Sequence, residues 1–138
     1  MNYLAWSLIA LASYSIVSPL VSFVTRDVPS TVAALITNGM LAIAALGVVL
    51  ASGESITPYL SHPKAPYMYL AGVFLAIGIL AYYRALALGP VSIVVPIFGL
   101  FIVTSSAIGI AFLDEALTAR KVAGIALALV AIYLTSVE

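Results

Sequence analysis

The stretch from Thr31 to Ser52, TVAALITNGMLAIAALGVVLAS, contains no charged residue. It is slightly longer than the ~20 residues that an α-helix needs to cross the ~30 Å hydrocarbon core of a bilayer. A chain in lipid has to satisfy its backbone hydrogen bonds internally, which a helix does and an open sheet does not. This stretch therefore predicts a membrane-spanning helix.

Similar apolar stretches lie on both sides of this one, and together they predict five membrane helices. Their approximate ranges are 3–24, 31–52, 66–88, 91–113 and 118–137. The chain has only five basic and five acidic residues among 138, and nearly all of them fall between these stretches. Hydrophobic residues make up 64% of the chain and its mean hydropathy is +1.25, which excludes an ordinary soluble domain. We expect one all-α integral membrane domain over residues 1–138, a multi-pass protein of the cell membrane with the lipid bilayer as its surroundings.

The connections between the predicted helices are short, so neighbouring helices are expected to be antiparallel and in contact. The turn Gly89-Pro90 separates the third helix from the fourth. Ser30 or Thr31 is expected to cap the second helix, and Thr118 the last one. The first helix lacks a basic start, so we expect it to stay in the protein rather than to act as a cleaved signal peptide.

Five crossings place the two termini on opposite sides of the membrane, and the basic residues barely decide which side is which. The N-terminal side carries Lys64, Arg120 and Lys121, and the other side carries Arg26 and Arg84. The positive-inside rule needs a larger excess than three against two to fix the topology. The sequence favours an inside N-terminus only slightly, and insertion in both orientations stays open.

The residue inventory argues against several classes of function. The net charge is zero, so no nucleic acid is indicated as a partner. The chain has no cysteine, no Walker sequence and one histidine, His62, without a partner at metal-ligand spacing. Asp114 and Glu115 are adjacent in a turn and are interpreted as a solvated pair facing Arg120 and Lys121. We expect no enzyme activity, no metal and no cofactor.

Arg84 is the one charge inside an apolar stretch away from a helix start. Ionisable residues within the membrane are costly and are candidates for a functional role. Arg84 lies four residues before the end of the third predicted helix, so its side chain can also reach the interface as an anchor. Binding of an anionic group and simple snorkelling both stay open. The neighbouring Tyr82 and Tyr83 approach that interface, and both hydrogen bonding between helices and an aromatic belt are open to them.

Polar residues and prolines inside the apolar stretches indicate a mildly polar, uncharged path. Pro96 removes a backbone donor and frees the carbonyl of Ser92, which a membrane helix tolerates where it faces protein or a water-filled cavity. Ser7, Tyr14 and Ser18 fall on one face of the first helix. The alternative is that such residues only form hydrogen bonds between helices. The candidate substrate-path residues are Ser7, Tyr14, Ser18, Asn38, Arg84, Pro96 and Ser105.

Gly124 and Ala128 are four residues apart on the last predicted helix. Small residues at this spacing allow membrane helices to approach closely. Packing within the chain and contact between subunits are both compatible with the pattern.

Two segments resemble signatures of a known transporter family. They are Ala81–Pro96, AYYRALALGPVSIVVP, and Phe112–Thr118, FLDEALT, followed by Gly124. On these residues the chain resembles the EamA branch of the drug/metabolite transporter superfamily, and its five stretches match one whole repeat of that family. The resemblance implies a single-repeat secondary transporter working by alternating access, with a cavity lined mainly by the helices at 3–24, 66–88 and 91–113. Related small multidrug resistance transporters use a glutamate in the first helix, and the absence of an acidic residue there argues against proton-coupled drug export.

These observations together predict a membrane transporter of a small polar metabolite that is not driven by ATP. An antiparallel homodimer is the expected assembly, because many relatives carry two inverted repeats in one chain. The two alternatives are a subunit of a lipid-carrier flippase and a membrane scaffold that transports nothing.

Overall fold

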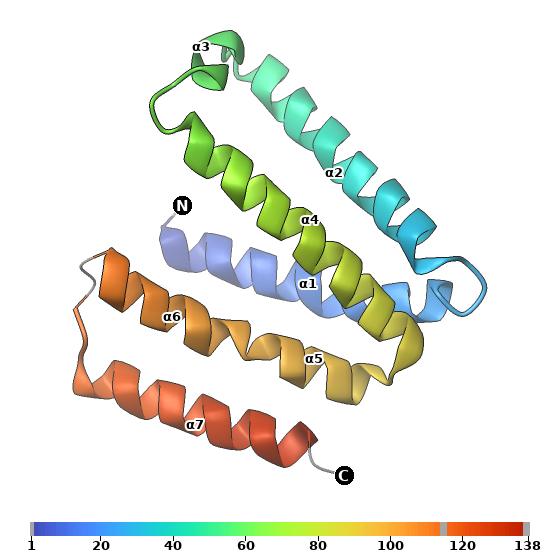
Figure 1. Ribbon diagram of the computed structural model, residues 1–138, viewed down its shortest axis with the longest axis vertical. Coiled ribbons are helices and arrows are strands. Elements are labelled where there is room, and N and C mark those ends of the chain that lie inside the picture. The colour runs from blue at the N-terminus through green and yellow to red at the C-terminus, as the bar shows by residue number, and fades with distance from the viewer. Residues whose placement is uncertain (1, 114–115, 137–138) are drawn as a thin grey trace. The chain divides into compact units, whose positions relative to one another are not determined.

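A computed structural model describes residues 2–113 and 116–136 of the chain. All of the regular secondary structure in these residues is α-helical (Figure 1). In chain order the helices are α1 (Tyr3–Val24), α2 (Ser30–Ala51), α3 (Thr57–Leu60), α4 (Ala65–Leu88), α5 (Val91–Gly99), α6 (Phe101–Phe112) and α7 (Ala119–Ser136). The described residues contain no strand. The predicted all-α class is therefore confirmed. The turn at Asp114 and Glu115 lies outside the described residues.

Four segments of the chain are helical, long enough and apolar enough to cross a membrane. They are Tyr3–Val24, Ser30–Ala51, Ala65–Leu88 and Val91–Phe112. The last predicted stretch is also helical, as α7, but it is not among these four. The 18 residues of α7 rise about 27 Å and begin with Arg120 and Lys121 in the first turn. The protein is thus a multi-pass membrane protein, and the fifth crossing stays a prediction.

The stretch predicted as one helix at 91–113 is two helices, α5 and α6, which are interrupted at Leu100. The interruption follows Pro96 by one turn and comes directly after Gly99, a residue with poor helix propensity. The Leu100 N–H donates to the carbonyl of Ile97 at 3.1 Å, which tightens the chain there. Pro96 therefore lies in a helix that ends early rather than in a continuous one.

The helix ends agree only partly with the predicted caps. Thr118 Oγ1 accepts a hydrogen bond from the Lys121 N–H at 3.2 Å, as the N-cap of α7 was expected to do. The cap predicted for α2 is wrong, because Pro29 occupies the N-cap position without a side-chain bond and Ser30 is already helical. The short helix α3 was not expected, and Pro58 lies at its start, where the missing N–H costs nothing.

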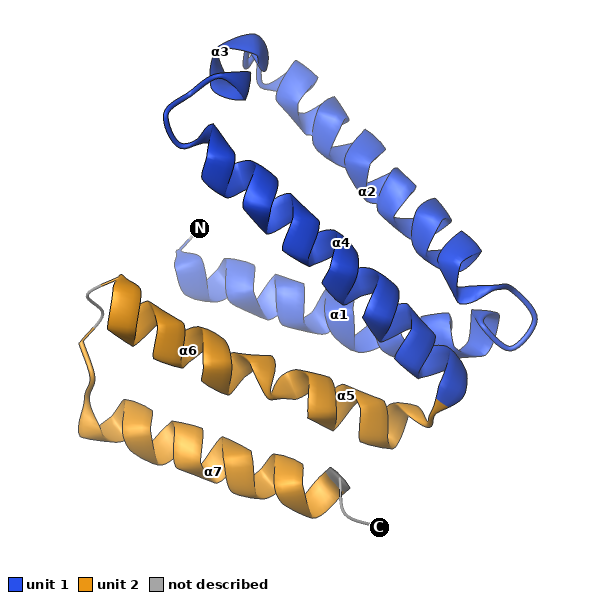
Figure 2. Cartoon of the chain, in the orientation of Figure 1, with its two compact units in different colours: residues 1–88 blue, residues 89–138 orange. Residues whose placement is uncertain are grey.

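The chain divides into two compact units, residues 1–88 and residues 89–138 (Figure 2). In unit 1, α4 packs against both α1 and α2. In unit 2, α7 packs against α5 and α6.

The core of unit 1 lies at one end of its helices. Except for Ala65, the buried residues come from the last turns of α1 and α4 and from the first turns of α2; they are Ser18, Val21, Ser30, Ala33, Ala34, Tyr82, Tyr83 and Leu86. We call this the packed end of unit 1, and the opposite end, where α1 begins and α2 ends, the open end. Figure 1 shows α1 and α4 close together at the packed end and separated at the open end.

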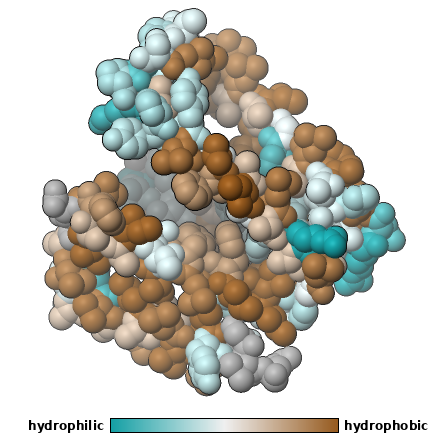
Figure 3. All heavy atoms as spheres, viewed as in Figure 1, coloured by the Kyte–Doolittle hydropathy of each residue, from teal (hydrophilic) through white to brown (hydrophobic). Residues whose placement is uncertain are grey.

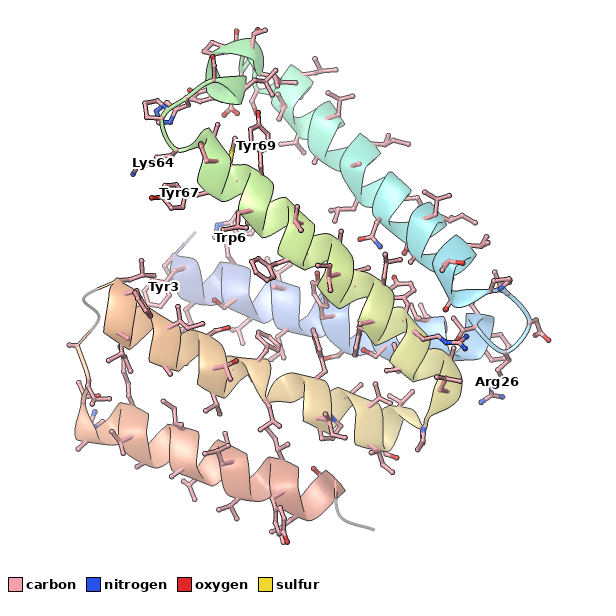
Figure 4. The ribbon with its side chains drawn as sticks, viewed as in Figure 1. Tyr3, Trp6, Arg26, Lys64, Tyr67 and Tyr69 are labelled. Atoms are coloured by element: carbon pink, nitrogen blue, oxygen red, sulfur yellow. The ribbon has the colours of Figure 1, made fainter. Side chains whose placement is uncertain are left out.

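Large apolar side chains are exposed along every long helix, as expected for a protein surrounded by lipid. On the face shown in Figure 3, hydrophobic residues predominate. Tyr3, Trp6, Tyr67 and Tyr69 lie with Lys64 at the open end of unit 1, whereas Arg26 lies at the packed end (Figure 4). Tyrosine and tryptophan are enriched at membrane interfaces, so we expect the open end of unit 1 to lie at one membrane surface.

The fifth crossing is testable with reporter fusions that distinguish the two sides of the membrane. The fusions are made in a chain whose orientation is fixed by two lysines inserted after Glu54. If α7 spans, a fusion after Thr135 should then lie on the same side as a fusion after Val28, and a fusion after Ser61 on the opposite side, because α2 separates residues 28 and 61. Agreement between the fusions at 135 and 61 in this oriented chain would mean that α7 does not cross.

Candidate functional site

Two adjacent tyrosines of α4 connect it to both neighbouring helices of unit 1. The hydroxyl of Tyr82 lies 2.7 Å from Ser18 Oγ in α1, and the hydroxyl of Tyr83 lies 2.7 Å from Thr37 Oγ1 in α2. Successive residues of an α-helix point about 100° apart, so neighbours in sequence reach different helices. Both tyrosines are buried. Hydrogen bonding between helices is therefore confirmed for both tyrosines, whereas their burial does not fit a place in an aromatic belt.

The three candidates on α1 are in different environments although they share one face of the helix. Ser18 is buried and bonded to α4. Ser7 is exposed, and its hydroxyl donates to the carbonyl of Tyr3 in its own helix at 2.9 Å. Tyr14 is 61% exposed. The shared face meets α4 only at the packed end, since α1 and α4 diverge beyond it.

A groove of about 480 Å³ lies between α2 and α4. Small and branched apolar side chains make up most of its lining, which is Thr31, Ala34, Leu35, Asn38, Gly72, Leu75, Ala76, Ile79 and Leu80. The half-buried Asn38 is its one amide, and its Nδ2 donates to the carbonyl of Ala34 at 2.8 Å. Its Oδ1 has no hydrogen-bond partner among the described residues. No buried side-chain oxygen or nitrogen among the described residues lacks a partner, so this carbonyl oxygen is an acceptor that is accessible in the groove.

Arg84 is exposed and lies about one turn from the end of α4. It forms no ion pair with any residue that the structure describes. Arg84 follows Tyr83 on α4, and Tyr83 lies at the packed end, so Arg84 also lies at that end of unit 1. This position is compatible with an interface anchor and with a binding role for an anion.

In unit 2, the remaining candidates do not share one site. Pro96 is half-buried in α5, whereas Ser105 is exposed on α6. The next residue, Ser106, lines a groove of about 240 Å³ with Gly124 and Ala128 of α7. The small-residue face of α7 thus faces α6 of the same chain. A Cβ added at Gly124 meets no atom within 4 Å, so close packing within the chain does not account for the glycine, and a contact between subunits stays a prediction.

The geometry of unit 1 is that of a membrane helix bundle with an open, mostly apolar groove and a few polar groups inside it. The family profile described as EamA-like transporter family matches residues 1–137 of the chain. The chain belongs to the EamA-like transporter family. No curated protein and no solved structure matches the chain.

Membership of the EamA-like transporter family confirms the resemblance seen in the segments Ala81–Pro96 and Phe112–Thr118. It makes the chain a membrane protein of a transporter family. Neither the family match nor the structure assigns a role to the candidate path residues, which stay predictions. Among the described residues, no three His, Cys, Asp or Glu side chains come together as a possible metal site.

The sequence does not indicate Thr37, and it does not identify the partners of Tyr82 and Tyr83. Each hydroxyl is a common polar group in a membrane helix, so the residue type alone gives no signal. What decides their role is which faces of α1, α2 and α4 meet, and this follows from packing rather than from the pattern within one helix.

Proposed function

We propose that this EamA-like protein is a secondary transporter in the cell membrane that moves a small polar metabolite by alternating access. Its functional form is an antiparallel homodimer. The family match supports transport in general. The substrate class, the mechanism and the assembly are our proposal, and they are supported by features of unit 1.

The observation that carries the proposal is the groove between α2 and α4 with Asn38 in it. Its volume of about 480 Å³ is large enough for a small molecule, which would lie in an open groove rather than in an enclosed cavity. The partnerless Oδ1 of Asn38 would accept an N–H or O–H from a bound metabolite, while the apolar lining contacts the rest of it. An accessible acceptor in a mostly apolar groove favours a ligand with such a donor, because a hydrogen bond is stronger in low-dielectric surroundings than in water.

The dimer is supported by two features of the chain. The basic residues are divided three against two between the two sides predicted for them, which allows insertion in both orientations. The buried residues of unit 1 lie almost entirely at one end of its helices, so the unit is asymmetric across the membrane. An inverted second copy would place an open end and a packed end at each membrane surface, as inverted repeats do in other transporters.

Uptake into proteoliposomes that contain only the purified chain tests the proposal. The screen covers amino acids, sugars and lipophilic cations, and we expect accumulation of an uncharged or carboxylate-bearing polar compound. Uptake by the chain alone argues against the flippase-subunit alternative, which needs a different second chain. No uptake of any compound across the screen would favour the scaffold alternative.

Asn38→Leu should weaken transport of the identified substrate. The change keeps a side chain of similar size and removes the amide, so KM should rise about tenfold for the loss of one hydrogen bond in a low-dielectric site. Met40→Leu is the matched control, because Met40 is on the same helix, exposed and outside the groove. An unchanged KM in Asn38→Leu would remove the groove from the substrate path.

A further inference from the structure

The packed end of unit 1 has the character of a closed gate. The hydroxyls of Tyr82 and Tyr83 each connect α4 to a different helix at this end. At the open end, the described residues contain no side-chain hydrogen bond between two of the long helices α1, α2 and α4. Burial also differs between the two ends. In α1, every residue before Val17 is exposed except Ala5.

The direction of one of the two bonds follows from the donors available. Thr37 has a single hydroxyl hydrogen, and its Oγ1 lies 3.0 Å from the Ala33 carbonyl in the same helix. With that hydrogen used, Tyr83 donates to Thr37. Thr37 is therefore an acceptor oriented by its own helix, and Tyr83 supplies the hydrogen of the bond between α2 and α4.

Adjacent positions on one helix couple the two bonds. Because Tyr82 and Tyr83 follow each other on α4, a rotation or tilt of α4 displaces both hydroxyls at once. Hydrogen bonds between membrane helices are weak, and losing one changes an equilibrium only about threefold. Contacts of this strength suit a gate, which has to open again in every cycle, better than they suit a permanent staple.

We propose that Tyr82 and Tyr83 are gating residues, which hold α4 against α1 and α2 to close the packed end while the open end admits substrate. This inference rests on the proposed alternating-access function. In this proposal, the hydrogen bonds of the two tyrosine hydroxyls keep the packed end closed, rather than the apolar contacts around them.

Single cysteines can report the two ends separately, because the chain contains no cysteine of its own. Ala34 is 2% exposed and lies at the packed end of the groove. Gly72 lies in the same groove toward the open end, and a Cβ added there meets no atom within 4 Å. The two single-cysteine variants are placed in nanodiscs, so that a charged maleimide can reach both membrane faces. With no other substitution present, Gly72→Cys should be labelled faster than Ala34→Cys.

The decisive comparison introduces Tyr82→Phe and Tyr83→Phe together into each cysteine variant. Loss of both hydroxyls should raise the labelling rate of Ala34→Cys roughly tenfold and lower that of Gly72→Cys. The reciprocal change is the mark of a gate, because opening one end of an alternating-access transporter closes the other. A general loosening of the bundle would raise both rates, and this outcome or two unchanged rates would overturn the proposal.

The control pair is Tyr67→Phe with Tyr133→Phe, two exposed tyrosines that undergo the same chemical change. It should leave both labelling rates as they are. If the double phenylalanine variant does not fold, Ser18→Ala and Thr37→Val remove the same bonds from the other side and should give the same reciprocal shift. The labelling needs no substrate, so failure of the gate and failure of the uptake screen are separate results.

Discussion

Two lysines inserted after Glu54 should abolish transport while the amount of protein in the membrane stays the same. Glu54 is exposed in the connection between α2 and α3, at the open end of unit 1. The insertion changes the predicted distribution of basic residues from three against two to five against two. An excess of this size fixes the orientation of the chain under the positive-inside rule.

The loss follows from the proposed antiparallel dimer, which needs copies in both orientations. A population with one orientation contains no partner for such a dimer. Uptake into cells that produce the variant is the measurement, and reporter fusions after Ser61 confirm that the orientation is uniform. Two serines inserted at the same place keep the length of the loop without adding charge, and this control should transport normally.

A second variant sharpens the test. Two lysines inserted after Asp27, combined with Lys64→Ala, give two basic residues on the N-terminal side and four on the other. This variant should be inactive alone for the same reason, with its orientation reversed. Cells that produce both variants contain both orientations again and should recover uptake. Full activity in either uniformly oriented population would contradict the antiparallel dimer.

The sequence predicts the helices of unit 1 well, because a membrane helix is determined by the length of an uncharged run. The predicted ranges 3–24, 31–52 and 66–88 differ by at most one residue at each end from α1, α2 and α4. The interruption at Leu100 is less predictable. A proline in a membrane helix indicates a kink, but it does not decide whether the helix continues after the kink.

The candidate site is predicted much less completely. Asn38 and Ser18 were singled out as polar residues in apolar runs, and they lie at the groove and at the packed end respectively. Their partners Tyr83, Tyr82 and Thr37 depend on the rotation of each helix about its axis. Hydrophobic pattern fixes this rotation in soluble proteins, where one face meets water. In lipid both faces are apolar, so the pattern within one helix carries little information about its neighbours.

Arg84→Gln should lower uptake of a carboxylate-bearing substrate about 10- to 100-fold, the range expected when a carboxylate loses hydrogen bonds to a charged partner. Arg84 carries the only charge within the span Ala65–Leu88, and no acidic residue accompanies it there. It is exposed and has no ion-pair partner among the described residues. A guanidinium in this state favours an anionic group on the substrate over a cation.

Arg84→Lys separates recognition from simple charge. A lysine keeps the positive charge but loses the planar fork that binds both oxygens of a carboxylate, so its uptake should fall between those of the parent chain and Arg84→Gln. If Arg84 only snorkels to the interface, lysine should replace it at little cost. The matched control is Arg26→Gln, which removes an exposed arginine at the same end of unit 1, in the loop after α1. Initial uptake rates are compared at equal amounts of inserted, monodisperse protein. If Arg84→Gln inserts normally and transports at the rate of the parent chain, Arg84 is an interface anchor, and selection among substrates has to come from Asn38 and the groove between α2 and α4.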